Sequence, residues 1–241
     1  TTTGAARCSS GLLWAPGYDE TSWDVDYRGQ DDSVWTNAAT GLTTNSYTID
    51  GLEDATQYDF RVSFYCNVND YYFSTVSTTT LCVPKTLPYV EDFEGISSST
   101  VATDNYGVMP PCWDYTLTGT ATYTTGTYRP GVYYGTNYAA SGSYALRLGG
   151  VGVFALPEFS APLDSLRIQF SDTITSAYYG LVVGALEGGL FVPIDTVELA
   201  LSVRNQIELS FKNYPGNSHT IAFMNYYSGS STYYYSYHYI D

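Results

Sequence analysis

The chain has 241 residues, with 24 acidic and 9 basic side chains and a formal net charge of −15 at pH 7. A chain this acidic repels phosphate backbones, so nucleic acid is excluded as an expected partner. Hydrophobic residues make up 44% of the sequence, which is enough for a folded core, and no apolar run approaches the ~20 residues that cross a bilayer. We therefore expect a globular protein without membrane insertion.

The local sequence pattern favours strands. Stretches with apolar residues at helical spacing are almost absent, and Thr, Tyr, Val, Ser and Gly are common. Apolar and polar residues alternate with period two, as in half-buried strands, in segments 23–28, 58–64, 166–170 and 206–211. The run 181–183 is continuously apolar, which is typical of a strand buried on both faces. The sequence predicts an all-β fold.

A domain boundary is expected where two prolines occur close together, at Pro84 and Pro88. Proline lacks the N–H that a central strand needs, so both residues indicate a break in the sheets. We predict an N-terminal domain over residues 1–82, a short linker over 83–88 and a C-terminal domain over 89–241.

The N-terminal domain resembles a fibronectin type III sandwich. Segment 11–16 is similar to the second strand of that family, 23–27 to the third strand and 74–81 to the last strand. Segment 46–58 is similar to its Leu…Thr-x-Tyr corner, the turn that leads into the strand beginning at the tyrosine. The resemblance implies that Trp14 is the core tryptophan. It also implies that the Tyr58 hydroxyl bonds back to the backbone just upstream. Such a module is expected to be a spacer or a protein-contact surface.

The C-terminal domain resembles the MAM-like jelly rolls of bacterial surface proteins, which include the cleaved-adhesin and choice-of-anchor families. The similar segments follow the family order: an opening strand at 87–95, a Pro-x-Cys-Trp element at 110–113, strands at 141–148, 154–157, 181–184 and 220–223, and a closing Tyr-x-Asp strand at 239–241. The two modules together resemble a piece of a large secreted protein of the Bacteroidetes type. This resemblance implies an extracellular or cell-surface location.

The jelly-roll resemblance also implies a structural calcium ion. Carboxylates and backbone carbonyls are hard oxygen ligands that suit this metal. In such jelly rolls the first and last strands are neighbours, so Glu94 and Asp241 are candidate ligands and Asp92 is a further candidate. The alternative is that these residues are solvated carboxylates at strand ends.

Adjacent tyrosines are the candidate ligand-binding residues. Aromatic rings stack on the apolar faces of sugar rings, and tyrosine hydroxyl groups supply hydrogen bonds. Consecutive residues of a strand point to opposite faces, so at least one tyrosine of each pair is expected to face away from the core. The candidates are Tyr133, Tyr134, Tyr178, Tyr179, Tyr226 and Tyr227. The alternative is that tyrosine serves as general strand filler or as a subunit contact.

The four cysteines suggest up to two disulfides in an oxidising compartment. A Cys82–Cys112 bridge would close a loop of ~30 residues and contribute roughly 3 kcal/mol on the loop-entropy estimate. Cys8 and Cys66 would then remain as a second pair, or as free thiols.

No recognisable catalytic pattern occurs, and His219 and His238 are the only histidines. We therefore expect no enzyme activity. The leading hypothesis is a non-catalytic adhesion segment that contacts a glycan or protein partner through exposed aromatic residues. Two alternatives stay open. The chain could be a structural subunit or repeat that contacts other subunits of a surface filament or scaffold, or it could be the accessory domains of a larger secreted hydrolase.

Overall fold

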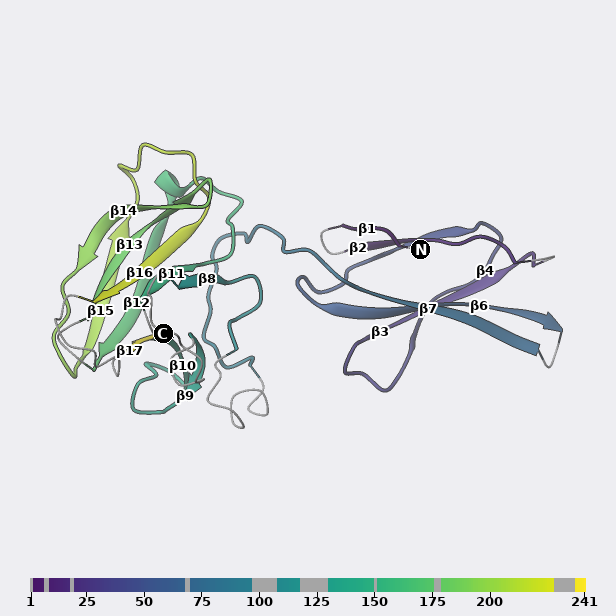
Figure 1. Cartoon of the computed structure of the whole chain (residues 1–241), viewed down its shortest axis with the longest axis horizontal. Coiled ribbons are helices and arrows are strands. Elements are labelled where there is room, and N and C mark those ends of the chain that lie inside the picture. Colours follow the sequence, from purple (N-terminus) through teal and green to yellow (C-terminus); the bar gives the residue numbers. More distant parts are fainter. Residues whose placement is uncertain are drawn as a thin grey trace. The chain divides into compact units, whose positions relative to one another are not determined.

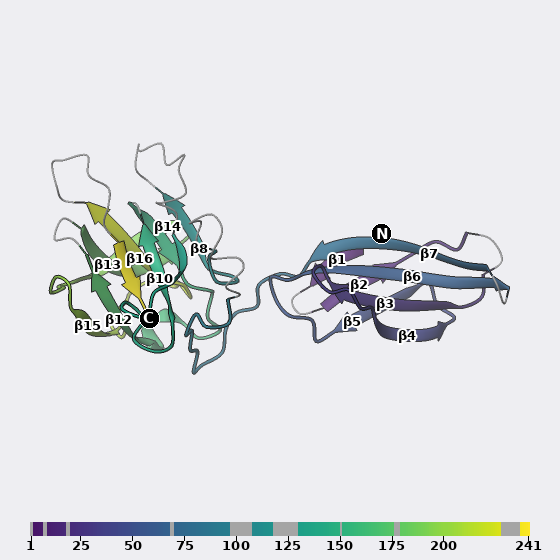
Figure 2. The same cartoon turned by 90° about the horizontal axis from the view of Figure 1, so that it is seen from below.

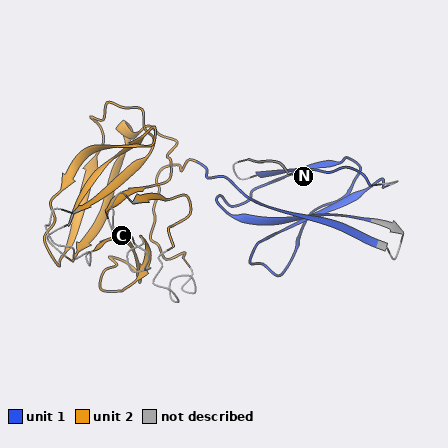
Figure 3. Ribbon diagram, viewed as in Figure 1, with its two compact units in different colours: residues 1–83 blue, residues 84–241 orange. Residues whose placement is uncertain are grey.

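The computed structural model describes residues 2–6, 9–17, 20–67, 70–96, 108–117, 130–149, 151–175, 179–227 and 237–241. Strands dominate these residues, beside a short 3-10 turn, η2, at Leu163–Ser165, and the predicted all-β class is confirmed. The chain divides into two compact units, residues 1–83 and 84–241 (Figures 1 and 3). No helix among the described residues has the length and apolar character of a membrane span.

Unit 1 is a pair of antiparallel sheets. The three-stranded sheet has the order β1-β2-β5, with β1 at Thr2–Ala6, β2 at Ser9–Leu13 and β5 at Ser46–Asp50. The four-stranded sheet has the order β4-β3-β6-β7, with β3 at Trp23–Gly29, β4 at Thr36–Leu42, β6 at Gln57–Asn67 and β7 at Asp70–Thr79. The long strands β6 and β7 lie side by side (Figure 2).

The alternation of the sequence produces the core of unit 1. Val25 and Phe60 point inward and are fully buried, whereas their neighbours on the same strands, Asp24 and Asp26 on β3 and Asp59 and Arg61 on β6, are partly exposed. Trp23 is 6% exposed and packs edge-on against Trp14, which is only partly buried, so the deeper tryptophan is the one on the third strand. The Tyr58 hydroxyl accepts a hydrogen bond from the backbone N–H of Glu53 at 3.1 Å and ties the corner to β6.

Unit 2 is a sandwich of two five-stranded antiparallel sheets. The β12 sheet has the order β15-β12-β17-β10-β9, with strands Arg204–Ser210, Arg167–Ile174, Tyr237–Ile240, Tyr144–Gly149 and Gly131–Tyr134. The β13 sheet has the order β14-β13-β16-β11-β8, with strands Leu190–Val197, Tyr179–Glu187, Ile221–Tyr227, Gly152–Ala155 and Asp114–Leu117. The predicted apolar run 181–183 is buried within β13.

The core of unit 2 is apolar in its centre and polar toward one end of β12. Phe170 of the β12 sheet meets Phe223 of the β13 sheet with ring centroids 5.2 Å apart. Two residues further along β12, Asp172 lies 2.6 Å from His238 of β17, and both side chains are completely buried. A buried ionisable pair is costly to desolvate, so each partner depends on the other to remain in the core.

The stretch predicted as a linker is partly built into unit 2. The Lys85 backbone N–H donates to the carbonyl of Glu158 at 2.7 Å, and the Lys85 carbonyl accepts from the N–H of Ser160 at 2.9 Å. These bonds form a parallel bridge between Lys85 and Phe159. Two prolines stop a strand, but the residues between them retain backbone groups that can pair.

The predicted opening strand at 87–95 is not a strand, and this expectation was wrong. The segment runs without ladder pairing, and its turn is fixed locally. The Glu91 carboxylate accepts from the backbone N–H of Phe93 at 3.1 Å, and Phe93 has φ of 58°. A strand exists only where a neighbour pairs with it, and no described strand lies in register beside this segment.

Candidate functional site

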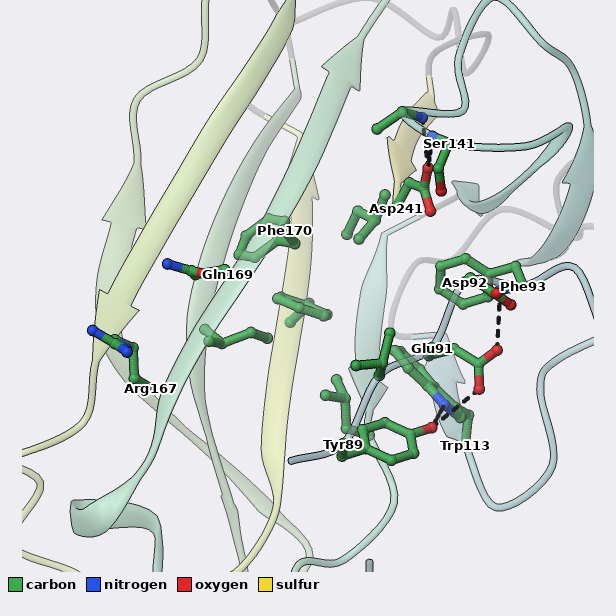
Figure 4. Close-up of a pocket in the computed structure, with 16 residues that line it drawn as sticks. Tyr89, Glu91, Asp92, Phe93, Trp113, Ser141, Arg167, Gln169, Phe170 and Asp241 are labelled. Carbon is green, nitrogen blue, oxygen red and sulfur yellow. Dashed lines mark hydrogen bonds between the residues drawn. The ribbon is translucent and has the colours of Figure 1, made fainter. Parts of the chain in front are cut away.

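Glu94 and Asp241 anchor the two halves of one turn, residues 140–144. Oε1 of Glu94 accepts from the backbone N–H groups of Ser143 and Tyr144, each at 2.7 Å. Oδ2 of Asp241 accepts from the N–H groups of Ala140 at 2.5 Å and Ser141 at 2.8 Å, and Figure 4 shows the latter contact. Two carboxylates that are distant in sequence therefore hold this turn through four charge-assisted hydrogen bonds.

Gly142, in the middle of that turn, allows the close approach of Glu94. Its φ is 58°, a left-handed conformation that side chains with a Cβ rarely adopt. A Cβ at this position would lie 2.3 Å from Oε1 of Glu94. The turn and the carboxylate that holds it therefore both require glycine here.

The fit of a calcium ion to the predicted ligands is limited. Among the described residues, no three acidic, histidine or cysteine side chains are grouped closely enough to hold a metal. Asp92 turns back on its own segment, where Oδ1 accepts from the N–H of Glu94 at 3.1 Å. Glu94 and Asp241 each use a single oxygen for their hydrogen bonds to the turn, so a second carboxylate oxygen of each is the donor that a hard cation would use.

A groove of about 510 Å³ lies beside Asp241 (Figure 4). We call it the β12 groove. One wall is β12 from Arg167 to Phe170, and the opposite wall is segment 89–93, which is not part of a strand. Leu156, Phe223 and Ile240 contribute apolar surface between the walls. Three carboxylates and one guanidinium line it, namely Glu91, Asp92, Asp241 and Arg167.

A hydrogen-bonded chain of side chains fixes the second wall of the groove. The Tyr89 hydroxyl donates to Oε2 of Glu91 at 3.1 Å and accepts from the indole N–H of Trp113 at 3.4 Å (Figure 4). Tyr89 also packs edge-on against Phe159. The wall is held by its own side chains and not by sheet pairing.

The outer face of the β12 sheet carries a group of tyrosines around an arginine. We call it the tyrosine face, and its members are Tyr133, Tyr138, Tyr237, Tyr239 and Arg147. Leu146 and Leu148 point into the core, so Arg147 between them points outward. Antiparallel register places Tyr239 directly opposite Arg147, and Tyr133 directly opposite Ala145.

The rings of the tyrosine face are in mutual contact. Tyr138 stacks on Tyr239 with centroids 3.9 Å apart and planes at 7°. The Arg147 guanidinium carbon lies 5.0 Å from the ring centroid of Tyr133 and 4.8 Å from that of Tyr237. Such distances give cation–π attraction on both sides of the guanidinium.

Exposure differs among the members of the tyrosine face. Arg147 and Tyr239 are buried, and Tyr133, Tyr138 and Tyr237 are half-buried. Burial, followed by the neighbouring Tyr138, raises the pKa of the Tyr239 hydroxyl, so this group stays protonated and neutral. The half-buried rings therefore pack on a buried layer formed by Tyr239 and Arg147.

The predicted tyrosine pairs do not form one site. Tyr133 belongs to the tyrosine face, whereas Tyr134 is 58% exposed and contacts Tyr144 edge-on at 5.4 Å. Tyr226 lies on the β13 sheet, where its ring covers Gly180. Tyr178 and the side chains of Tyr179 and Tyr227 lie outside the described residues.

Sequence reasoning missed Tyr138, Tyr237, Tyr239 and Arg147. The signal for two of them was the spacing of Tyr237 and Tyr239, since residues two apart in a strand share a face. A similar alternation marks Arg147 as an outward residue between two leucines. Tyr138 lies in a turn after β9, so no strand periodicity points to it.

The other predicted residues have structural surroundings. Cys82 and Cys112 are both disulfide-bonded. Cys8 and the side chain of Cys66 lie outside the described residues. His219 is held by its ring nitrogen Nδ1, 2.9 Å from the carbonyl oxygen of Phe159, and His238 is completely buried.

Comparison with known proteins gives only distant likenesses. No protein-family model matches the chain, and no curated protein matches it. One similar solved structure comes from work on the promiscuous specificity of carbohydrate-binding modules of the β-sandwich superfamily. It is 11% identical in sequence, the match covers 100% of this chain and 94% of that chain, and the TM-score is 0.36. Another is SGBP-B from a xyloglucan utilisation locus of Bacteroides uniformis: 8% identity, 99% of this chain, 68% of that chain, TM-score 0.30. A third is the M60 catalytic domain with two CBM51 domains from Clostridium perfringens ZmpB: 8% identity, 96% of this chain, 29% of that chain, TM-score 0.26. At these TM-scores nothing about the ligand of this chain is inferred from them.

Proposed function

We propose that the chain is a non-catalytic, extracellular binding segment that holds a neutral glycan on the tyrosine face. The observation that carries the proposal is the grouping of three half-buried tyrosine rings around the buried Arg147 on one sheet face. Rings that already pack against one another and against Arg147 offer stacking surface and hydroxyl groups, and ordering them for a ligand costs little entropy. The formal charge of −15 disfavours acidic polysaccharides.

We assign unit 1 the role of a fibronectin type III spacer. The support is its arrangement of three and four antiparallel strands and the hydrogen bond from Glu53 to the Tyr58 hydroxyl, which corresponds to the tyrosine corner of immunoglobulin-like sandwiches. The disulfide-bonded Cys82 and Cys112 agree with an oxidising, extracellular setting.

A glycan array with the whole chain tests the proposal. We expect binding of neutral polysaccharides that weakens at least about tenfold in Tyr237→Ala, which removes one ring that flanks Arg147. Tyr134→Ala is the matched control, because this tyrosine is exposed and lies outside the tyrosine face. No glycan binding, or equal loss in both variants, would overturn the proposal.

We keep a structural calcium ion as a secondary proposal for Glu94 and Asp241. The support is that both carboxylates hold one turn and that each uses a single oxygen to do so. Calcium would add a cation to an acidic surface. The test is thermal unfolding with and without calcium. We expect calcium to raise the Tm of the wild-type chain, and we expect this rise to be absent in Asp241→Asn. A wild-type Tm that does not change on adding calcium would exclude the ion.

One observation favours a second function, assembly into a filament or scaffold. The edge strand β7 exposes Tyr71, Tyr72 and Phe73 at 39%, 52% and 60%. An edge strand with exposed aromatic residues can pair with another chain and bury those residues in the contact. Light scattering over a concentration series distinguishes this function from glycan binding. We expect assembly of the wild-type chain and a monomer for Phe73→Lys, and a strictly monomeric wild-type chain would exclude it.

A further inference from the structure

The sandwich of unit 2 has an open flank between its edge strands β14 and β15, which belong to different sheets. A slot of about 560 Å³ enters the sandwich there, lined by these two strands, by Val183 of β13 and by residues of segment 211–215. We call it the flank slot. Its volume lies in the range of pockets that hold small molecules in other proteins.

The floor of the flank slot is apolar and reaches the core. Val183 and Phe211 are buried members of the core cluster of unit 2. Val192 and Leu209 pack against that cluster and are only partly buried, so they offer apolar surface to the slot. Because the burial of apolar surface is favourable, an apolar molecule in the slot would extend the core.

A β-bulge in β14 places a carboxylate on the inner face of the sheet. Val183 pairs with Asp195, but the next residue, Gly184, pairs with Pro193, so Ile194 is an extra residue in β14. Residues directly opposite one another in an antiparallel pair share a face. Asp195 therefore lies on the same face as the core residue Val183, and it lines the slot. Bulges commonly re-aim a side chain in this way.

Asp195 is the charged group that a ligand in the flank slot would meet. It is exposed, and its Oδ1 accepts from the backbone N–H of Thr196 at 2.8 Å, whereas no described residue donates a hydrogen bond to its Oδ2. The other carboxylate of the lining, Glu208, already accepts from Arg167 at 3.2 Å and from Gln169 at 2.9 Å. No basic side chain lines the slot. The slot therefore combines an apolar floor with one available negative charge.

The free edge of β14 is a poor template for an added strand. Pro193 has no N–H to donate, and the bulge at Ile194 interrupts the regular spacing of the edge. An inward-pointing charge such as Asp195 is a further device by which proteins block an edge strand. A small molecule needs no backbone pairing, so these features favour it over an extended peptide as the occupant of the slot.

We propose that the flank slot binds a small molecule that carries a protonated amine on an apolar body. The body would lie over Val192, Leu209 and Phe211, and the ammonium group would pair with Asp195 at the exposed side. A body of about ten to fifteen non-hydrogen atoms suits a slot of this volume. The site lies on the flank of the sandwich and does not depend on glycan binding at the tyrosine face.

Ligand-observed NMR titration of the 241-residue chain with phenylbutylamine tests the proposal. We expect saturable binding, and we expect it to be at least about threefold tighter than that of phenylbutanol, which keeps the apolar body but lacks the charge. Phenylbutanoate should bind more weakly than the alcohol, because its carboxylate would lie beside that of Asp195. The absence of saturable binding, or equal binding of the amine and the alcohol, would overturn the proposal.

Two variants of the chain locate the site. Asp195→Asn should abolish the preference for the amine and leave the binding of the alcohol unchanged, a result that a merely structural role of Asp195 would not give. Leu209→Trp should fill the slot and abolish the binding of both ligands, and the exposed Asp195→Asn variant keeps the test valid if Leu209→Trp fails to fold. Glu198→Gln, at an exposed position outside the slot, is the control and should bind as the wild type does. A preference for the amine that survives in Asp195→Asn, or binding that persists in a folded Leu209→Trp chain, would contradict the proposal.

Discussion

Among the described residues, buried Asp, Arg and His side chains occur in unit 2 and not in unit 1. On the four-stranded sheet of unit 1, Arg28 pairs with Asp59 at 3.0 Å and Arg61 with Asp26 at 2.9 Å, at partly exposed positions. The guanidinium carbons of Arg28 and Arg61 lie 4.5 and 4.4 Å from the ring centroid of Trp35.

Unit 2 also has an exposed ion pair, between Arg167 and Glu208, but in addition it buries ionisable side chains. Asp172 and His238 are completely buried in the core, and Arg147 is 6% exposed beneath tyrosine rings. Surface pairs contribute little because water screens them, whereas a buried charge that loses its partner is strongly destabilising. The difference predicts that unit 1 tolerates the loss of a partly exposed ion pair, whereas unit 2 does not tolerate the loss of a buried partner.

The largest expected effect comes from Asp172→Ala, which leaves His238 buried without its carboxylate. We expect the free energy of unfolding of unit 2 to fall by roughly 3–5 kcal/mol. Urea denaturation with hydrogen exchange resolved by segment measures this and should show unit 1 unchanged. Asp164→Ala, at an exposed position in the same unit, is the control and should change stability by less than about 0.5 kcal/mol. Equal effects of the two variants would contradict the argument that burial makes the loss of a partner costly.

A smaller loss is expected for Arg147→Ala, which removes cation–π contacts to Tyr133 and Tyr237 together with the packing of the arginine stem. We expect about 1–3 kcal/mol from thermal unfolding of unit 2. Arg147→Lys keeps the charge but not the planar group, so its loss should lie between those of wild type and alanine. A lysine variant as unstable as alanine would show that the planar guanidinium, and not the charge, is what unit 2 needs.

In unit 1, the substitution that corresponds to Arg147→Ala is Arg61→Ala. It removes the ion pair to Asp26 and one of the two contacts to Trp35. Because the pair is partly exposed and Arg28 still covers the tryptophan, we expect a loss of about 1 kcal/mol or less. Tryptophan fluorescence during denaturation follows it. A loss as large as that from Asp172→Ala would break the comparison.

The elements that could be predicted from sequence are those set by local alternation. The segments around Val25, Phe60 and Phe170 alternate with period two and form β3, β6 and β12, because one face of each strand must be buried. The segment 89–93 shows why prediction fails elsewhere: its residues favour a strand, but strand formation also needs a neighbour in register, which a local pattern does not reveal.

The candidate site was predictable only in part, for a similar reason. Tyr133 was found because it occurs in a pair, but its neighbours on the tyrosine face come from β10 and β17, which sheet register brings together over long sequence separations. Tyr134 and Tyr226 lie apart from the tyrosine face, Tyr134 against Tyr144 and Tyr226 over Gly180 of the β13 sheet. Grouping on a sheet face depends on which strands become neighbours, and the sequence pattern does not specify this.

The smallest expected effect concerns pH, and here the two units should behave alike. Hydrogen bonds from Tyr214 and from the backbone of Asn217 lower the pKa of the Glu187 carboxyl below its ordinary value of 4.5. In unit 1, the hydrogen bond from Ser77 and, after the opposing effect of burial, Arg28 lower the pKa of Asp59 below 3.8. A carboxyl whose pKa is lower in the folded state stabilises that state above the unfolded pKa, and this contribution is lost as pH falls through the folded pKa. Both units should therefore lose a little stability on acidification below about pH 4. Melting temperatures of Glu187→Gln and Asp59→Asn at pH 7 and pH 3 check this: each variant should differ from wild type at pH 7 and approach it at pH 3. A difference that persists at pH 3 would show that these contacts act by packing and not by charge.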